Sequence, residues 1–227
     1  MRTAAILPVK SFDAAKQRLG SLLGSGSRHA LAQAMFQDVL SSLRKTGSIE
    51  RIVVVASEPS VEFAADEQVV LIEDELRDGQ SPAAMTGINW AVASGFDRVL
   101  LVPGDTPLLS VAELEALLAD APEDVVIIPD RHGTGTNGLL LRPPTVIDPS
   151  FGPDSLQRHV AAAEAAGVSH RVERMPSLMF DVDTSDDLAV VAETIEGSRA
   201  VAPRTRGALR QLDRAGARLN VTAGAET

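Results

Sequence analysis

The sequence predicts an α/β protein, a three-layer sandwich with a mainly parallel sheet. Short runs of Val, Ile and Leu alternate with helical patterns along the chain, which is typical of parallel sheets. These runs are aliphatic throughout, as expected for strands that are covered on both faces. Aromatic residues make up only 3% of the 227 residues and Tyr is absent, so Leu, Val, Ile and Ala must form the core.

The first half of the chain contains four predicted strands. They cover Thr3 to Val9, Arg51 to Ala56, Gln68 to Ile72 and Arg98 to Val102. A polar loop follows the first strand, and Ser27 is expected to cap a helix whose apolar residues recur at helical spacing. A second helix is expected to begin at Ser81-Pro82 and to end near Ser94, because Ser is a good N-cap and Pro suits the first helical position.

The second half adds further strands and helices. Ser110 and Glu113 form a capping-box pattern ahead of a helix, and another helix is expected from Asp154-Ser155 to about Ala166. Strands are predicted over Asp124 to Pro129 and near Ser177 to Val182, the latter followed by a helix. Residues 1–196 are expected to form a single domain. Residues 197–227 are expected to form a tail with one helix near Arg206 to Ala215 and then disorder.

Composition excludes several classes of function. The formal charge is −10 and there is no strong basic stretch, which argues against nucleic-acid binding and against an electrostatic membrane anchor. The chain has no Cys, so disulfides, thiolate catalysis and zinc–sulfur sites are excluded. No signal peptide and no membrane-spanning apolar run are recognisable, so a soluble cytoplasmic protein is expected.

Two acidic motifs follow apolar runs. Asp105 lies in "LLVPGDTPLL", and Asp181 and Asp183 lie in "FDVDTSDDL". Ligands of such sheets bind beyond the carboxyl ends of the strands, where two carboxylates can share one Mg²⁺. Structural roles are the alternative: Asp105 would cap a turn, and Asp183 or Thr184 would cap the following helix.

The cluster Asp181-Val182-Asp183-Thr184 after an apolar run is also similar to the Asp-x-Asp-x-Thr signature of haloacid-dehalogenase-type phosphatases, although here Thr directly follows the second Asp. Two observations count against this class. The motif normally opens that fold, whereas here it lies near the carboxyl end of the chain. Those enzymes also use a downstream Lys, and no Lys follows Lys45.

Cations and small residues form candidate anion sites. Lys10, Lys16 and Arg18 gather in "PVKSFDAAKQRLG", which is neither a Walker A loop nor a G-x-G-x-x-G motif. If it is a phosphate-binding loop, its cations would bind a nucleoside triphosphate. The alternative is a solvent-exposed loop without a binding role. The loops "HGTGTNG" and "FGPDS" offer backbone N–H groups to a second anion. The four His residues show no metal-ligand spacing.

Together these motifs resemble one family. "LPVKSFDAAKQRL", "DGQSPAAMTGINWA", "LLVPGDTPLL", "GTGTNGLLLRPP", "FGPDSLQRH" and "FDVDTSDDL" occur in the order found in the CofC/FbiD-type guanylyltransferases of coenzyme F420 biosynthesis. The resemblance spans about Thr3 to Val191. It implies a nucleotidyltransferase fold related to the GT-A glycosyltransferases, and a requirement for GTP and Mg²⁺. The implied acceptor is phosphoenolpyruvate in bacterial members and 2-phospho-L-lactate in archaeal ones.

The resemblance also implies roles for individual residues. Asp105 and Asp183 would hold the metal, with Lys16 as a further catalytic residue. The residues implied to bind the nucleotide are Pro8, Lys10, Lys16, Arg18, Gly79, Gln80, Ser81 and Gly104. Those implied to bind phosphoenolpyruvate are Thr136, Gly152 and Ser155. Related enzymes often have Gly-Leu-Asn at Gly79-Gln80-Ser81, so the contact with guanine would differ here.

Two other hypotheses remain open at this point. One is a nucleotidyltransferase or GT-A transferase with another acceptor, such as a sugar phosphate or molybdopterin. The other is a regulatory domain that binds GTP without catalysis, which two acidic strand ends disfavour. A monomer or a homodimer is expected, and the product would be handed to the downstream transferase of the pathway.

Overall fold

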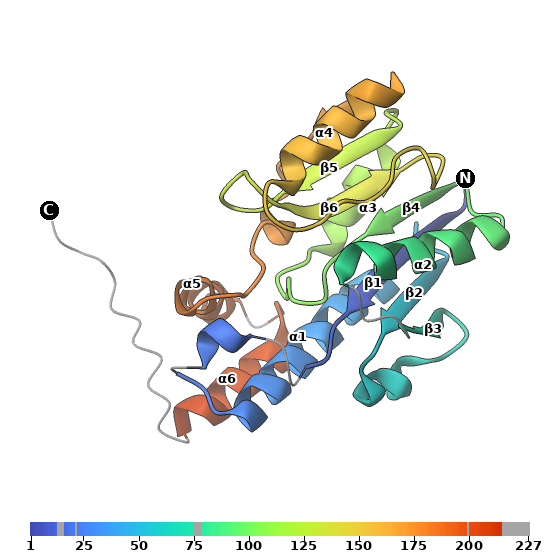
Figure 1. Ribbon diagram of the computed structural model, residues 1–227. Helices are drawn as coiled ribbons and strands as arrows, with labels where there is room; N and C mark the ends of the chain where they lie inside the picture. Colours follow the sequence, from blue (N-terminus) through green and yellow to red (C-terminus); the bar gives the residue numbers. More distant parts are fainter. Residues whose placement is uncertain (13–15, 21, 75–78, 199, 215–227) are drawn as a thin grey trace, which may run out of the picture.

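A seven-stranded sheet forms the centre of the molecule (Figure 1). The computed structural model describes residues 1–12, 16–20, 22–74, 79–198 and 200–214. The strands lie in the order β3-β2-β1-β4-β6-β5-β7. Their bounds are β1 (Thr3–Val9), β2 (Arg51–Ala56), β3 (Val69–Glu73), β4 (Arg98–Leu101), β5 (Val125–Pro129), β6 (Thr136–Leu141) and β7 (His170–Val172). Only β6 runs antiparallel to its neighbours, which confirms the mainly parallel sheet.

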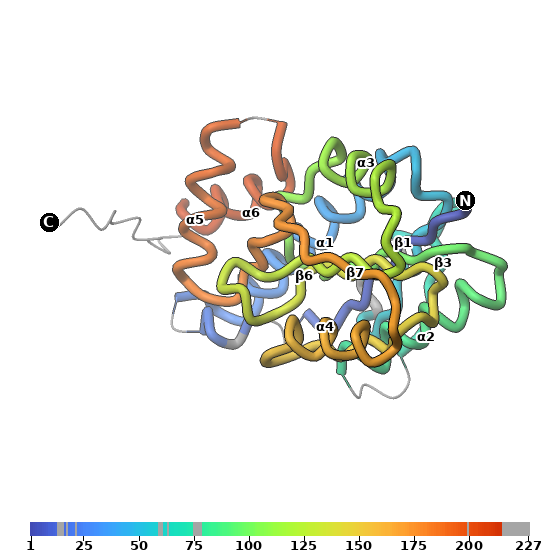
Figure 2. Tube along the Cα trace, turned by 90° about the horizontal axis from the view of Figure 1, so that it is seen from above, coloured from blue at the N-terminus to red at the C-terminus, as the bar shows by residue number. Residues whose placement is uncertain are grey.

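Helices cover both faces of the sheet and complete the predicted three layers (Figure 2). Their bounds are α1 (Ser25–Lys45), α2 (Gln80–Ala93), α3 (Val111–Ala119), α4 (Ser155–Ala166), α5 (Ser185–Glu196) and α6 (Pro203–Arg214). One core lies between the sheet and α1 with α3, and a second lies between the sheet and α2 with α4. All seven residues of β1 are buried, which explains why this strand is free of charged residues.

A third apolar cluster joins α1, α5 and α6. Leu31 and Met35 of α1 belong to it together with Leu209 and Leu212 of α6. The segment predicted as a tail therefore contributes a helix to the packed structure. The predicted helix near Arg206 to Ala215 is found as α6, and the disorder predicted after it falls on residues 215–227, outside the described residues.

The strand predicted near Ser177 to Val182 is wrong. The structure has a short 3-10 helix, Pro176–Leu178, and the last strand is β7, which pairs in parallel with β5. The following segment instead makes isolated backbone hydrogen bonds, such as the one from Val182 N to Asp105 O at 3.1 Å. Leu178 and Val182 are buried here without strand pairing, and periodicity alone does not distinguish such a segment from a strand.

The predicted starts of the first two helices lie close to the observed ones, but the predicted capping residues are wrong. The first helix begins at Ser25, two residues before the predicted cap. The cap of α2 is Gly79 rather than Ser81, and the Ser81 hydroxyl accepts a hydrogen bond from Phe151 N at 2.8 Å. Ser110 caps α3 as predicted. Within the described residues, no helix has the length and apolar character needed to cross a membrane.

Candidate functional site

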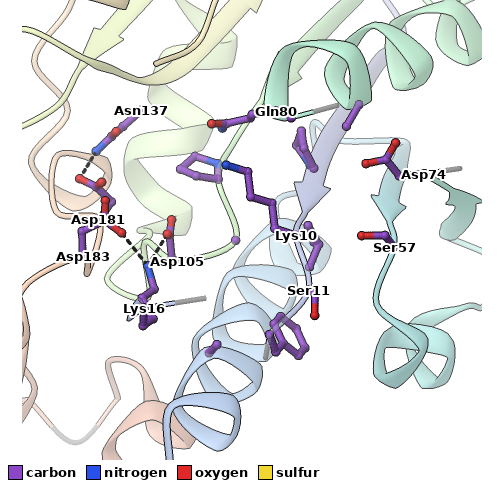
Figure 3. A pocket seen from close by; sticks show the side chains of 18 of the residues that line it. Lys10, Ser11, Lys16, Ser57, Asp74, Gln80, Asp105, Asn137, Asp181 and Asp183 are labelled. Carbon is purple, nitrogen blue, oxygen red and sulfur yellow. Dashed lines mark hydrogen bonds and ion pairs between the residues drawn. The ribbon is translucent and has the colours of Figure 1, made fainter. Parts of the chain in front are cut away.

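A cavity of about 600 Å³ opens at the carboxyl ends of β1, β2 and β4 (Figure 3). This is the edge at which ligands bind in parallel α/β sheets. Of the predicted site residues, nine line the cavity: Pro8, Lys10, Lys16, Gly79, Gln80, Gly104, Asp105, Thr136 and Asp183. The structure thus brings most of the predicted site together from segments that are far apart in the sequence.

Three charged side chains meet at one end of the cavity. Lys16 Nζ lies 2.5 Å from Asp105 Oδ2 and 3.1 Å from Asp183 Oδ1 (Figure 3). The Lys16 side chain is only 4% exposed, whereas those of Asp105 and Asp183 are 31% and 51% exposed. Burial alone lowers the pKa of Lys16, but the charges of the two carboxylates and their hydrogen bonds outweigh it and raise that pKa. The ammonium group therefore remains charged between the two carboxylates.

Backbone contacts hold the two carboxylates near each other. Asp105 follows the end of β4, and its carbonyl oxygen accepts the hydrogen bond from Val182 N. The Asp187 carboxylate accepts hydrogen bonds from Asp183 N at 3.1 Å and from Thr184 N at 2.7 Å. Thr184 and Asp187 form a capping box at the start of α5, so the predicted Thr184 cap is confirmed. The cap that starts α5 thus also fixes the backbone of Asp183.

Asp105 and Asp183 suit a shared divalent cation in their donor chemistry. Oxygens of both side chains already contact one positively charged nitrogen. Among the described residues, no group of three or more His, Cys, Asp or Glu is arranged to hold a metal. A pair of carboxylates is sufficient for Mg²⁺, which keeps several waters and completes its shell with substrate phosphates.

Asp181 is a third carboxylate beside this pair, and sequence reasoning did not assign it a role. It lines the cavity and accepts a hydrogen bond from Asn137 Nδ2 at 3.0 Å. Burial, followed by the charge of Asp105, raises the pKa of Asp181 to about 6. Its position two residues before Asp183 was the available signal.

The opposite side of the cavity is formed by the start of α2 and the ends of the neighbouring strands. Lys10 and Gln80 point into it, and Ser57 and Asp74 lie beyond them (Figure 3). Gly79 adopts a φ of +111°, a conformation that favours glycine, and its missing Cβ leaves open space. The first turn of a helix offers unpaired N–H groups and a positive dipole end to an anion.

Sequence reasoning also missed Ser57, Asp74 and Asn137. Ser57 and Asp74 directly follow the last residues of β2 and β3, so the rule that ligands bind at the carboxyl ends of strands pointed to them. Asn137 lies on β6, where its amide donates to Leu178 O at 3.1 Å and to Asp181. It lies within the loop "HGTGTNG" that was predicted as an anion site, but that prediction rested on backbone N–H groups and not on the Asn137 side chain.

Four predicted residues do not line the cavity. Arg18 is exposed in the short helix Gln17–Leu19, and Ser81 bonds to Phe151 as described above. Gly152 is exposed with a φ of +110°, and Ser155 is buried with its N–H donated to Gly152 O at 3.1 Å. Ser81 and Ser155 lie in the first turns of α2 and α4, Gly152 lies in the loop before α4, and the contact of all four residues with a ligand stays a prediction.

Comparison with known proteins shows which family the chain resembles. The family described as guanylyl transferase, CofC-like, matches residues 3–212, so the match includes most of α6, which the resemblance in the sequence did not cover. A phosphoenolpyruvate guanylyltransferase of Conexibacter woesei is 47% identical over 93% of this chain and 97% of its own length. A 2-phospho-L-lactate guanylyltransferase of Methanothermobacter thermautotrophicus is 33% identical over 88% of each chain.

Other relatives and solved structures extend the comparison. A 3-phospho-D-glycerate guanylyltransferase of Colwellia psychrerythraea is 34% identical over 85% of this chain and 92% of its own. A crystal structure from Desulfovibrio desulfuricans, described as a nucleotide-diphospho-sugar transferase, aligns with a TM-score of 0.75 at 22% identity, covering 94% of this chain and 96% of that one. At that identity the structural likeness shows the fold alone.

Proposed function

The chain belongs to the CofC-like guanylyl transferase family, and from this premise we propose that it transfers GMP from GTP to phosphoenolpyruvate. The products would be enolpyruvoyl-2-diphospho-5'-guanosine and pyrophosphate. The observation that carries the proposal is the convergence of Asp105, Asp183 and Lys16 at the strand ends of one cavity. The relative at 47% identity supports phosphoenolpyruvate as the acceptor.

The reaction joins two anions. A phosphate oxygen of the acceptor attacks the α-phosphorus of GTP, a new P–O bond forms, and the bond to the β-phosphate oxygen breaks as pyrophosphate leaves. The attacking oxygen is already anionic, so no general base is needed. The site must therefore offset charge repulsion and align the two substrates, which are the tasks of fixed cations and backbone N–H groups.

We assign Mg²⁺ to Asp105 and Asp183. When bound there, it supplies the positive charge that offsets repulsion between the phosphates and stabilises the leaving pyrophosphate. Lys16 contacts the same two carboxylates and is assigned to the triphosphate. The buried stem of Lys16 restricts the ammonium group to the place where these charges meet.

We assign the nucleotide to the half of the cavity formed by Pro8, Lys10, Gly104 and the start of α2. The N-terminal turn of α2 and Lys10 would bind phosphate oxygens, with Gly79 and Gln80 near the guanine. The acceptor would lie toward Thr136, which lines the cavity from β6. The product would serve coenzyme F420 biosynthesis in the cytoplasm and pass to the downstream transferase of that pathway.

The second candidate function is guanylyl transfer to a different phosphorylated carboxylic acid. Relatives at 33% and 34% identity are named for 2-phospho-L-lactate and 3-phospho-D-glycerate. All three acceptors present one phosphate and one carboxylate, so the same constellation of charges serves each of them.

The test is pyrophosphate release from GTP and Mg²⁺ with each of the three acceptors in parallel. The downstream transferase and its deazaflavin acceptor should be present to consume the product. We expect release with phosphoenolpyruvate to exceed that with the other two acceptors. Release with 2-phospho-L-lactate or 3-phospho-D-glycerate alone would reassign the acceptor, and no release with any acceptor would refute the proposal.

A further inference from the structure

His159 is the most deeply buried titratable side chain next to the cavity that the reaction above does not use. It lies on α4 with 0% exposure, and the ring of Phe151 packs edge-on against it at 5.4 Å. Its Nδ1 is 2.9 Å from Thr136 Oγ1, and its Nε2 is 2.8 Å from the backbone N of Ser150. The ring thus connects the loop before α4 to the side chain that lines the acceptor half of the cavity.

The hydrogen bonds determine where the ring carries its proton. A backbone N–H can only donate, so His159 Nε2 must accept the bond from Ser150 and has no proton. Burial, followed by the charge of Arg158, lowers the pKa of His159 to about 4, so the ring is neutral near pH 7. A neutral ring with an accepting Nε2 carries its proton on Nδ1 and donates it to Thr136 Oγ1.

This direction has a consequence for Thr136. A hydroxyl oxygen that accepts from His159 keeps its own hydrogen for another partner. Thr136 is 7% exposed and lines the cavity, and none of the described residues accepts a hydrogen bond from its hydroxyl. The hydroxyl hydrogen is therefore available to a ligand oxygen.

We propose that His159 is a positioning residue that orients the Thr136 hydroxyl as a hydrogen-bond donor to an anionic oxygen of the acceptor substrate. The chain of donation runs from Ser150 N–H to the ring, from the ring to Thr136, and from Thr136 to a carboxylate or phosphate oxygen. The last step rests on the proposed function, because it assigns the acceptor to this half of the cavity. The tautomer of His159 does not rest on it.

Nitrogen-15 NMR of the ligand-free protein tests the tautomer directly. We expect one ring with a protonated Nδ1 and an unprotonated Nε2 at pH 7, and the signals should disappear in His159→Gln. Assignment of those signals to a ring protonated at Nε2, or at both nitrogens, would overturn the proposal. This result does not depend on which substrate the enzyme uses.

Kinetics test the action through Thr136. We expect His159→Phe to raise the KM for phosphoenolpyruvate about ten- to a hundredfold, the range for one hydrogen bond to a charged group, while the KM for GTP changes less than about twofold. His159→Gln retains a donor and an acceptor and should recover part of the loss. Thr136→Ser should keep the acceptor KM nearer to normal than Thr136→Val.

The double variant separates positioning from general support of the fold. If His159 acts through Thr136, His159→Phe should add little to the acceptor KM once Thr136→Val is present. Additive losses, or equal losses in the KM for both substrates, would contradict the proposal. If no phosphorylated acceptor is turned over, the proposed function fails, and the NMR experiment still decides the orientation of the hydroxyl.

Discussion

Asp105 illustrates how one side chain depends on the strand before it. It follows β4 at the edge where the cavity opens, and its neighbours at this point are Lys16 and the segment that carries Asp183. We expect Asp105→Asn to lower kcat about a hundredfold or more, the cost of removing one charged contact to the transition state. The midpoint of thermal unfolding should fall as well, because the buried Lys16 ammonium loses the nearer of its two carboxylate partners, so kcat is compared at a temperature at which both proteins are folded.

Asp148→Asn is the matched control for this prediction. Asp148 is exposed and lies outside the cavity, so the substitution changes the net charge equally without touching the site. Its kcat should stay within about twofold of the unsubstituted protein. Near-normal turnover in Asp105→Asn would contradict the assigned role.

The lowered pKa of His159 makes the free energy of unfolding depend on pH. Its pKa is about 4 when folded and about 6.5 when unfolded, so the unfolded chain binds the proton first as the pH falls. This group contributes full stability above pH 7 and loses it progressively between about pH 6.5 and 4. The loss by pH 5 should be about 2 kcal/mol. Urea unfolding at pH 7.5 and pH 5 measures it, and His159→Gln should lack this component.

At the residue scale, individual charged residues of the site were easier to predict from the sequence than the hydrogen bonds that position side chains. Asp105 was predicted from a strand followed by a turn, and Lys16 from the rarity of Lys in the chain. The bond between His159 and Thr136 joins positions 23 residues apart and required the packing of α4 on the sheet. No local pattern encodes such a pair, because helices and strands approach each other according to the whole core.

At the element scale, the close packing of α2 on the sheet depends on a missing side chain. A Cβ at Gly87 would lie 2.5 Å from Ile6 Cγ2, near the backbone of the central strand β1. Ala is favoured over Gly in helices by about 1 kcal/mol, but the overlap with a buried β-branched side chain is expected to outweigh this. We expect Gly87→Ala to lower the free energy of unfolding by about 1–2 kcal/mol.

Gly207 provides the opposite case for the same substitution. It lies in α6, and a Cβ there would meet nothing within 4 Å. Gly207→Ala should therefore raise the free energy of unfolding by up to about 1 kcal/mol. Urea unfolding of both variants compares the two, and a stabilising Gly87→Ala would show that α2 can move away from β1 without cost.

Helices were predicted more accurately than the last strand, because capping residues next to a helix start can be recognised in the sequence. Thr184 and Asp187 carry a capping box within four residues, so the start of α5 can be found from the sequence. The apolar residues between Ser177 and Val182 give no comparable signal. Leu178 fills the space beside β6, where a Cβ at Gly138 would come within 2.6 Å of Leu178 Cδ2, and Leu178 and Val182 are buried without strand pairing.

At the scale of the whole molecule, α6 is joined to α1 by one buried carboxylate. Asp38, which is 3% exposed, accepts hydrogen bonds from Arg204 N at 3.2 Å and from Thr205 N at 2.8 Å. It serves as the cap that α6 lacks in its own sequence. Because Asp38→Ala leaves a buried N–H without an acceptor, we expect it to lower the free energy of unfolding by about 2 kcal/mol.

Asp38→Asn is the conservative partner of this variant. Its side-chain oxygen still accepts one of the two hydrogen bonds, so its loss of stability should be smaller. Urea unfolding gives both values. Equal stability of the Ala variant and the unsubstituted protein would show that α6 does not depend on this contact.

The overall architecture was predictable because alternating strands and helices restrict the possible topologies. The antiparallel strand β6 and the packing of α6 were not, since both depend on contacts between distant segments. The site follows the architecture: Asp105, Thr136 and Asp183 were predicted from the sequence, whereas Asn137 in the cavity wall and the bond between His159 and Thr136 required the structure.

The central claim is that this site joins GMP to the phosphate of phosphoenolpyruvate. Phosphorus NMR of the protein with GTP, Mg²⁺ and phosphoenolpyruvate tests it most directly. We expect the single phosphate signal of phosphoenolpyruvate to be replaced by two coupled signals of a diphosphate, together with an equal amount of pyrophosphate. Consumption of GTP without that coupled pair, or no consumption at all, would contradict it.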